Sequence, residues 1–182
     1  MFKDIVLKIV QMITAPESSW RKLSATESHE SFINRYLHPI FGAIALTSFI
    51  GELWIAPNGS LEHALKSAII NLVTVYGGYY IGSYILNEYL PRFGISKNEP
   101  KTQQFVGYAS ALMYLLYITL PFFPNFIIIQ LFALYTVYIV YSGYGVYIVG
   151  KEDNRMHFTG VATTLILLTP ALIKGILSIL IK

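Results

Sequence analysis

Residues 158–181 of the chain are FTGVATTLILLTPALIKGILSILI, an apolar stretch with a single charged residue, Lys174, and one proline, Pro170. A helix needs about 20 consecutive apolar residues to cross the hydrocarbon core of a bilayer. The stretch therefore predicts a transmembrane helix, interrupted at Pro170. Because lipid offers no partners for backbone polar groups, a chain built from such stretches folds as a helix bundle.

Apolar stretches of this kind occur four more times. The expected spans lie at about 36–56, 61–89, 103–120 and 126–149, and 158–181 is the fifth. The composition agrees, with 54% hydrophobic and 13% charged residues, whereas about a quarter of the residues in soluble proteins are charged. The sequence therefore predicts an all-α, polytopic transmembrane helix bundle with about five spans in one domain, residues 36–182.

The first 35 residues have a different pattern. In residues 1–13 the apolar side chains recur at helical spacing between polar ones, which predicts an amphipathic helix. Such a helix either lies in the membrane interface or packs against the spans of its own chain. Trp20 stands beside Arg21 and Lys22, as an aromatic and basic anchor at the lipid headgroups does. We expect residues 1–35 to form cytosolic amphipathic and interfacial helices.

The distribution of Lys and Arg predicts the orientation. Basic residues occur in the tail before residue 36, in the loop at 92–102 and in the loop at 150–157, whereas the loops after the first and third expected spans contain none. Cytoplasmic connections carry the excess of basic residues in membrane proteins. We therefore expect a cytosolic N-terminus and a C-terminus on the opposite side.

Glu52, Lys66 and Lys174 are expected inside the spans at comparable depth near the outer surface, and Asn71 adds a polar group within the second span. A charge in hydrocarbon costs a few kcal/mol unless it is paired or hydrated. The sequence leaves two interpretations of this candidate intramembrane polar site. It is either a structural ion pair with snorkelling lysines or a functional polar site that faces outward.

Small residues suggest places where helices approach closely. Gly78 and Gly82 form a GxxxG pair in the second expected span, and Gly107 and Ala111 repeat the spacing in the third. This spacing favours helix packing, either within the bundle or across a homodimer.

Several function classes lack support in the sequence. The absence of cysteine excludes disulfides and thiolate metal sites, and the four histidines fall on different sides of the membrane in the expected topology. No phosphate-binding loop, zinc-protease, nucleophile-elbow or dinucleotide motif occurs. The net charge of +3 is spread over short loops, which does not indicate nucleic-acid binding. We predict no catalytic, cofactor-binding or metal-binding residues, and no enzymatic activity.

Three features together resemble a known family. They are residues 103–110, QQFVGYAS, before a span closed by Pro121 and Pro124; the tyrosine-rich segment 135–147 with Ser-Gly-Tyr-Gly at 142–145; and residues 15–20, APESSW, ahead of the first span. This arrangement resembles the Yip1 domain family, in its bacterial branch, over nearly the whole chain. The resemblance implies five spans, a cytosolic N-terminus and an external C-terminus.

Eukaryotic members of that family bind small Rab-type GTPases and act in vesicle formation. The chain lacks their long N-terminal region and their Asp-Leu-Tyr-Gly-Pro motif, so the resemblance does not transfer that role. We expect a non-enzymatic protein of the bacterial cytoplasmic (inner) membrane that organises the lipid bilayer or protein partners at its cytosolic face, as a monomer or a homo-oligomer. The alternative is a small transporter or channel that uses the polar site.

Overall fold

The computed structural model describes residues 2–26, 28–57, 59–123 and 131–181, and all regular structure in these ranges is helical. The helices are α1 (Phe2–Thr14), α2 (Pro16–Thr26), α3 (His29–Phe32), α4 (His38–Trp54), α5 (Leu61–Tyr89), α6 (Glu99–Ala109), α7 (Ala111–Thr119), α9 (Thr136–Gly143) and α10 (Arg155–Leu180). A π-helical turn, Ile33–Leu37, joins α3 to α4, and another, Tyr144–Ile148, extends α9. Short 3-10 turns occupy Leu90–Phe93, Leu120–Phe122, Phe132–Tyr135 and Glu152–Asn154.

Within the described ranges, three continuous helical segments are long and apolar enough to cross a membrane: His29–Trp54, Leu61–Phe93 and Glu152–Leu180. The pair Glu99–Ala109 and Ala111–Phe122 qualifies as a fourth span only if its two halves are taken together across a bend of 46°. The apolar helix Phe132–Ile148 is shorter than these spans. It covers part of the span expected at 126–149, of which residues 126–130 lie outside the described ranges.

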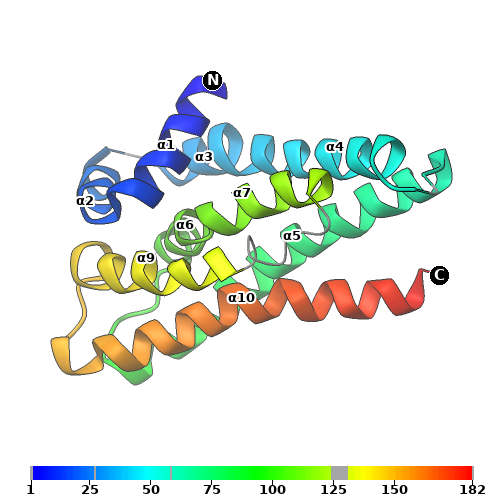
Figure 1. Cartoon of the computed structure of the whole chain (residues 1–182). Coiled ribbons are helices and arrows are strands. Elements are labelled where there is room, and N and C mark those ends of the chain that lie inside the picture. The colour runs from blue at the N-terminus through cyan, green and yellow to red at the C-terminus, as the bar shows by residue number, and fades with distance from the viewer. Residues whose placement is uncertain (1, 27, 58, 124–130, 182) are drawn as a thin grey trace.

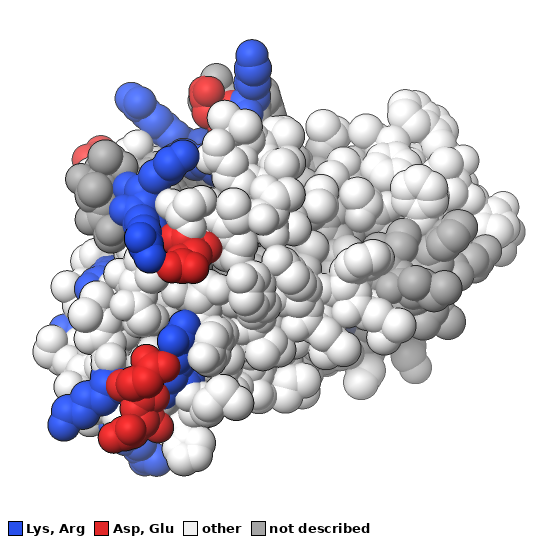
Figure 2. Space-filling model, turned by 60° about the vertical axis from the view of Figure 1, so that its left-hand side comes forward, with Lys and Arg blue, Asp and Glu red and all other residues white. Residues whose placement is uncertain are grey.

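The long helices lie side by side, with α5 packed against both α4 and α10 (Figure 1). The turn between α4 and α5 lies at the same end of the molecule as the C-terminus, and α2 lies at the opposite end (Figure 1). We call the first the α4–α5 end and the second the α2 end. Charged side chains gather at one end of the face shown in Figure 2 and leave the remainder largely uncharged, as expected of a surface that faces lipid.

Local sequence explains where α5 begins and ends. The Ser60 hydroxyl accepts a hydrogen bond from the His63 backbone N–H, which is a standard N-cap. After Tyr89 the chain tightens into a 3-10 turn with Pro91, and Gly94 follows at a φ of +73°. Glycine adopts this left-handed conformation without the steric cost that a side chain would add, so the helix stops there.

The bend between α6 and α7 occurs at Ser110, where the sequence contains neither glycine nor proline. The Ser110 hydroxyl donates a 2.7 Å hydrogen bond to the carbonyl of Val106, one turn earlier. Such back-bonding competes with the helical ladder and bends helices. The helix expected at 103–120 is therefore divided into two by a bend.

Pro170 does not interrupt α10, contrary to the prediction. The helix runs from Arg155 to Leu180 through the proline. Neighbouring helices and local adjustments satisfy the backbone groups that a proline frees within a membrane span. On the neighbouring α5, Gly78 leaves room for the proline ring, since a Cβ at Gly78 would lie 2.5 Å from Pro170 Cγ.

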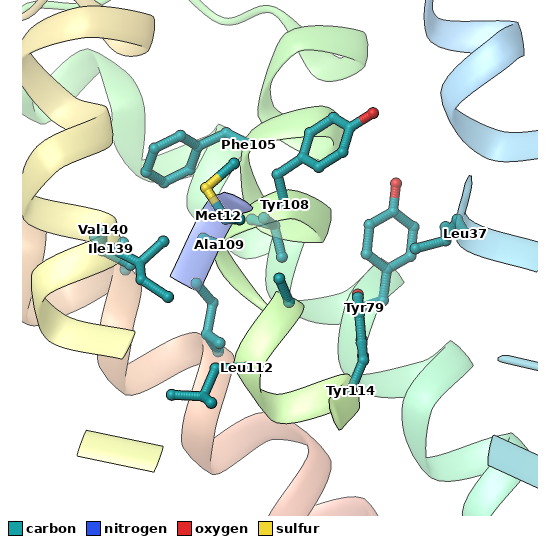
Figure 3. Close-up of a cluster of buried hydrophobic side chains, with 14 of the residues drawn as sticks. Met12, Leu37, Tyr79, Phe105, Tyr108, Ala109, Leu112, Tyr114, Ile139 and Val140 are labelled. Carbon is teal, nitrogen blue, oxygen red and sulfur yellow. The ribbon is translucent and has the colours of Figure 1, made fainter. Parts of the chain in front are cut away.

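One hydrophobic core runs through the bundle and includes the N-terminal helices. Met12 of α1 lies among Phe105 and Ala109 of α6 and Ile139 and Val140 of α9 (Figure 3). All five side chains are buried. The N-terminal segment is therefore packed against the spans, which is one of the two arrangements that the amphipathic pattern allows.

Candidate functional site

Three of the four polar residues singled out in the sequence line one pocket at the α4–α5 end. Glu52 of α4, Asn71 of α5 and Lys174 of α10 border a cavity of about 280 Å³, together with Ser48 and Tyr117. No ion pair joins Glu52 to either lysine among the described residues. The three side chains thus form a polar pocket, with a carboxylate and an ammonium in its wall.

Lys66 lies outside this pocket. Its Nζ is 2.8 Å from the Glu62 carboxylate, one helical turn earlier on α5. Glu followed by Lys four residues later is a favourable helical pair. The spacing in the sequence would have revealed this pair, which explains Lys66 without the pocket.

Asn71 is buried in the wall of the pocket, with 8% of its surface exposed. Its amide Nδ2 donates a 3.0 Å hydrogen bond to the Ser67 carbonyl. The amide Oδ1 is buried and has no hydrogen-bond donor among the described residues. A buried acceptor without a donor costs about 1–3 kcal/mol, so this oxygen favours a ligand or water that would supply one.

The lysine that lines the pocket, Lys174, contacts an aromatic ring. Lys174 Nζ lies 5.8 Å from the centroid of the Tyr117 ring, a cation–π distance. Its neighbours on α10, Leu172 and Ile176, expose 65% and 58% of their surface. Lys174 therefore stands at the boundary between the pocket and the apolar outer face of the bundle.

The small residues contact other helices of the same chain. Gly78 faces Pro170 of α10, whereas a Cβ at Gly82 would lie at an ordinary 3.7 Å from the Leu165 carbonyl. A Cβ at Gly107 would collide with the ring of Phe32 from α3, and Ala111 is fully buried at the start of α7. These contacts occur within one chain.

The sequence suggested that Trp20 is an anchor at the lipid headgroups, but the structure shows that it is not. It is fully buried, and its indole Nε1 donates a 3.0 Å hydrogen bond to the Ile139 carbonyl of α9. Its ring stacks on Phe105 at a centroid distance of 5.0 Å and contacts Tyr147 at 5.1 Å. Gly143 makes the close approach possible, because a Cβ there would lie 2.6 Å from the indole ring. A buried indole N–H needs a hydrogen-bond acceptor, and the Ile139 carbonyl supplies it here.

The helix α1 has two apolar sides. Ile5, Ile9 and Met12 are buried in the core, whereas Val6 and Leu7 expose 58% and 52% of their surface. The helix crosses the bundle obliquely at the α2 end (Figure 1). The second apolar side therefore faces outward where the bundle ends.

The basic connections lie together at this end. Asn154, in the loop before α10, donates a 3.0 Å hydrogen bond to the Phe93 carbonyl in the loop after α5. His29 Nε2 lies 2.7 Å from Gln103 Oε1, which joins the N-terminal region to α6. The N-terminal helices and both basic loops thus lie at the same end of the bundle (Figure 1).

Among the described residues, no group of three His, Asp or Glu side chains is placed to hold a metal ion.

The long apolar helices and the largely uncharged part of the face shown in Figure 2 indicate a helical integral membrane protein. The chain belongs to the Yip1 domain family, whose model matches residues 10–181. Neither a curated protein nor a solved structure matches the chain.

Proposed function

We propose that the protein is a non-enzymatic membrane organiser that acts on the cytosolic leaflet through the exposed apolar side of α1. The observation that carries the proposal is that α1 is fixed by Ile5, Ile9 and Met12 while Val6, Leu7 and Val10 remain exposed. An amphipathic helix at the edge of a bundle inserts such side chains into the boundary between headgroups and acyl chains.

The proposal includes the finer topology. It has a fifth span at 126–149, the N-terminus in the cytosol and the C-terminus outside a bacterial cytoplasmic membrane. This topology would bring α1 to the inner surface of the membrane. Leu131, Phe132 and Leu134 expose about 60% of their surface each, which supports a lipid environment for this segment. Lys3 is exposed beside the apolar side of α1, where an anionic leaflet would attract it.

The first test locates α1 in liposomes that contain anionic lipid. The chain has no cysteine, so Leu7→Cys and the α2 control Glu17→Cys each give one labelling site. A fluorophore at residue 7 should be quenched by a quencher on the acyl chains, and a fluorophore at residue 17 by a quencher in water. Equal quenching of both by the aqueous quencher would place α1 away from the lipid.

The second test measures organisation directly. We expect the wild type to increase self-quenching of a fluorescent anionic lipid in the same liposomes, and Leu7→Glu to abolish the increase. Ser18→Glu is the matched control, because Ser18 is exposed on α2 and its added charge remains in water. If Leu7→Glu is folded and clusters lipid as well as the wild type does, the proposed role of α1 is wrong.

The pocket favours a second candidate, a small transporter. A route across the membrane would have to continue inward from Glu52, Asn71 and Lys174. Tyr117 also lines a second void, but that void measures only about 10 Å³ and lies against Tyr79 and other packed side chains. This is about the volume that one water needs. Substrate-specific flux in liposomes that Glu52→Gln abolishes would favour transport over the organiser.

A further inference from the structure

The polar pocket at the α4–α5 end has two opposite charges in its wall. Glu52 and Lys174 both line the cavity, and no ion pair between them occurs among the described residues. A charge in hydrocarbon is costly unless it is paired or hydrated. A ligand that carries one positive and one negative group would neutralise both.

The donors and acceptors indicate which charge belongs where. An ionised Glu52 carboxylate accepts hydrogen bonds only, and the Asn71 Oδ1 is a buried acceptor without a donor. Both suit a primary ammonium, which has three N–H donors. Lys174 supplies three donors and no acceptor, which suits a phosphate.

The size of the cavity suggests a small polar group. Its volume of about 280 Å³ falls just below the range of about 300–1,000 Å³ for pockets that hold drug-sized ligands. A headgroup of a few atoms fits such a space, whereas a larger soluble metabolite would not be enclosed.

The surroundings of Lys174 indicate that the ligand is a lipid. Leu172 and Ile176 are exposed on α10 on either side of Lys174, and Ile55 is exposed at the rim of the pocket. Acyl chains can lie along this apolar surface while the headgroup occupies the pocket.

We propose that this pocket binds the headgroup of an aminophospholipid, with its ammonium between Glu52 and Asn71 and its phosphate at Lys174. The site is independent of α1, because it lies at the opposite end of the bundle (Figure 1). It would hold a phosphatidylethanolamine-type lipid in the leaflet opposite to the α2 end.

The test uses the full-length protein in detergent and short-chain lipids as probes. Binding is measured by the rise in unfolding temperature and by native mass spectrometry, because a ligand of the folded state stabilises it. We expect phosphatidylethanolamine to bind at least tenfold more tightly than phosphatidylcholine, whose quaternary ammonium has no N–H donor. It should also exceed phosphatidylglycerol, which has no ammonium, and free phosphoethanolamine, which has no acyl chains.

Substitutions then test the residues. Glu52→Gln and Lys174→Met should each weaken phosphatidylethanolamine binding about tenfold while the lipid-free protein retains its helical circular dichroism spectrum. The Ser178 hydroxyl bonds to the backbone carbonyl of residue 174, so Lys174→Met preserves that contact. Lys66→Met is the matched control and should bind as the wild type does, because Lys66 pairs with Glu62 outside the pocket.

Three results would overturn the proposal. Equal affinity for phosphatidylethanolamine and phosphatidylglycerol would show that no ammonium is recognised. Binding of free phosphoethanolamine as tight as that of the lipid would assign the pocket to a soluble zwitterion. A loss in Lys66→Met equal to that in Lys174→Met would show that the lysines act through surface charge and not through the pocket.

Discussion

Replacing Trp20 with alanine tests whether the N-terminal helices are part of the folded core. The side chain is fully buried, stacks on Phe105 and donates one hydrogen bond to the Ile139 carbonyl. Truncation of a buried tryptophan to alanine costs about 3–5 kcal/mol through lost contacts and the cavity that remains. The lost hydrogen bond accounts for about 1 kcal/mol of that destabilisation.

A second substitution separates the two contributions. Trp20→Phe retains an aromatic ring for stacking on Phe105 but removes the indole N–H. We expect it to lower the free energy of unfolding by about 1–2 kcal/mol, because one partner of a buried hydrogen bond is deleted and the smaller ring leaves part of the space empty. The order wild type, Trp20→Phe, Trp20→Ala should hold in any detergent that preserves the fold.

The assay is a denaturant titration in mixed micelles, followed by tryptophan fluorescence. The chain contains two tryptophans. In a Trp54→Phe variant that keeps Trp20, Trp20 is the single tryptophan, so the fluorescence reports on its surroundings alone. Circular dichroism follows the Trp20 variants. Trp54→Ala is the control: Trp54 is 73% exposed, and an exposed substitution changes stability by about 0.5 kcal/mol or less. If Trp20→Ala lowers the free energy of unfolding no more than Trp54→Ala does, Trp20 is an interfacial anchor. The conclusion that the N-terminal segment packs into the core would then be wrong.

Three further changes test the packing and the topology. Gly78→Ala should destabilise the bundle by about 1–3 kcal/mol in a thermal unfolding series, because its Cβ would lie 2.5 Å from the proline ring of α10. Gly42→Ala is the control and should have no such cost, since no atom lies within 4 Å of the new Cβ. Tyr147→Phe should cost about 1–2 kcal/mol in the same series, because it deletes the 2.8 Å hydrogen bond that the buried hydroxyl donates to an α6 side-chain amide. Leu61→Cys and Lys97→Cys should react with a membrane-impermeant maleimide from opposite sides of the membrane; reaction of both from one side would contradict the expected orientation.

Hydropathy predicted the long helices well because it depends on solvent and not on partners. The span expected at 61–89 coincides with α5, Leu61–Tyr89. The break between α6 and α7 was not predictable from glycine or proline, since it arises where Ser110 bonds back to Val106. At Pro170 the sequence predicted an interruption that does not occur, because a glycine on another helix makes the groove that accommodates the proline ring.

The position of Trp20 also depends on distant residues. Its neighbours Phe105, Ile139 and Tyr147 lie 85 or more residues away along the chain, as the 119-residue separation of the Trp20–Ile139 hydrogen bond illustrates. The local sequence, a tryptophan followed by two basic residues, is the same for an interfacial anchor and for a buried residue at the end of a bundle. Only the tertiary partners distinguish them, and a pattern of nearby residues contains no information about those partners.

The polar site shows which coordinate of a membrane helix the sequence determines. Counting from the ends of the spans gives the depth of a residue, and it placed Glu52 and Lys174 at one level; the structure joins them, together with Asn71, in one pocket. It placed Lys66 at that level too, but the direction in which a side chain points around the helix axis was not part of that count. Lys66 instead faces Glu62, a partner given by the four-residue spacing of the helix. Depth alone therefore overestimates the number of residues in a polar site. Adding the helical period would have removed Lys66 and kept the residues whose opposite charges the proposed lipid would neutralise.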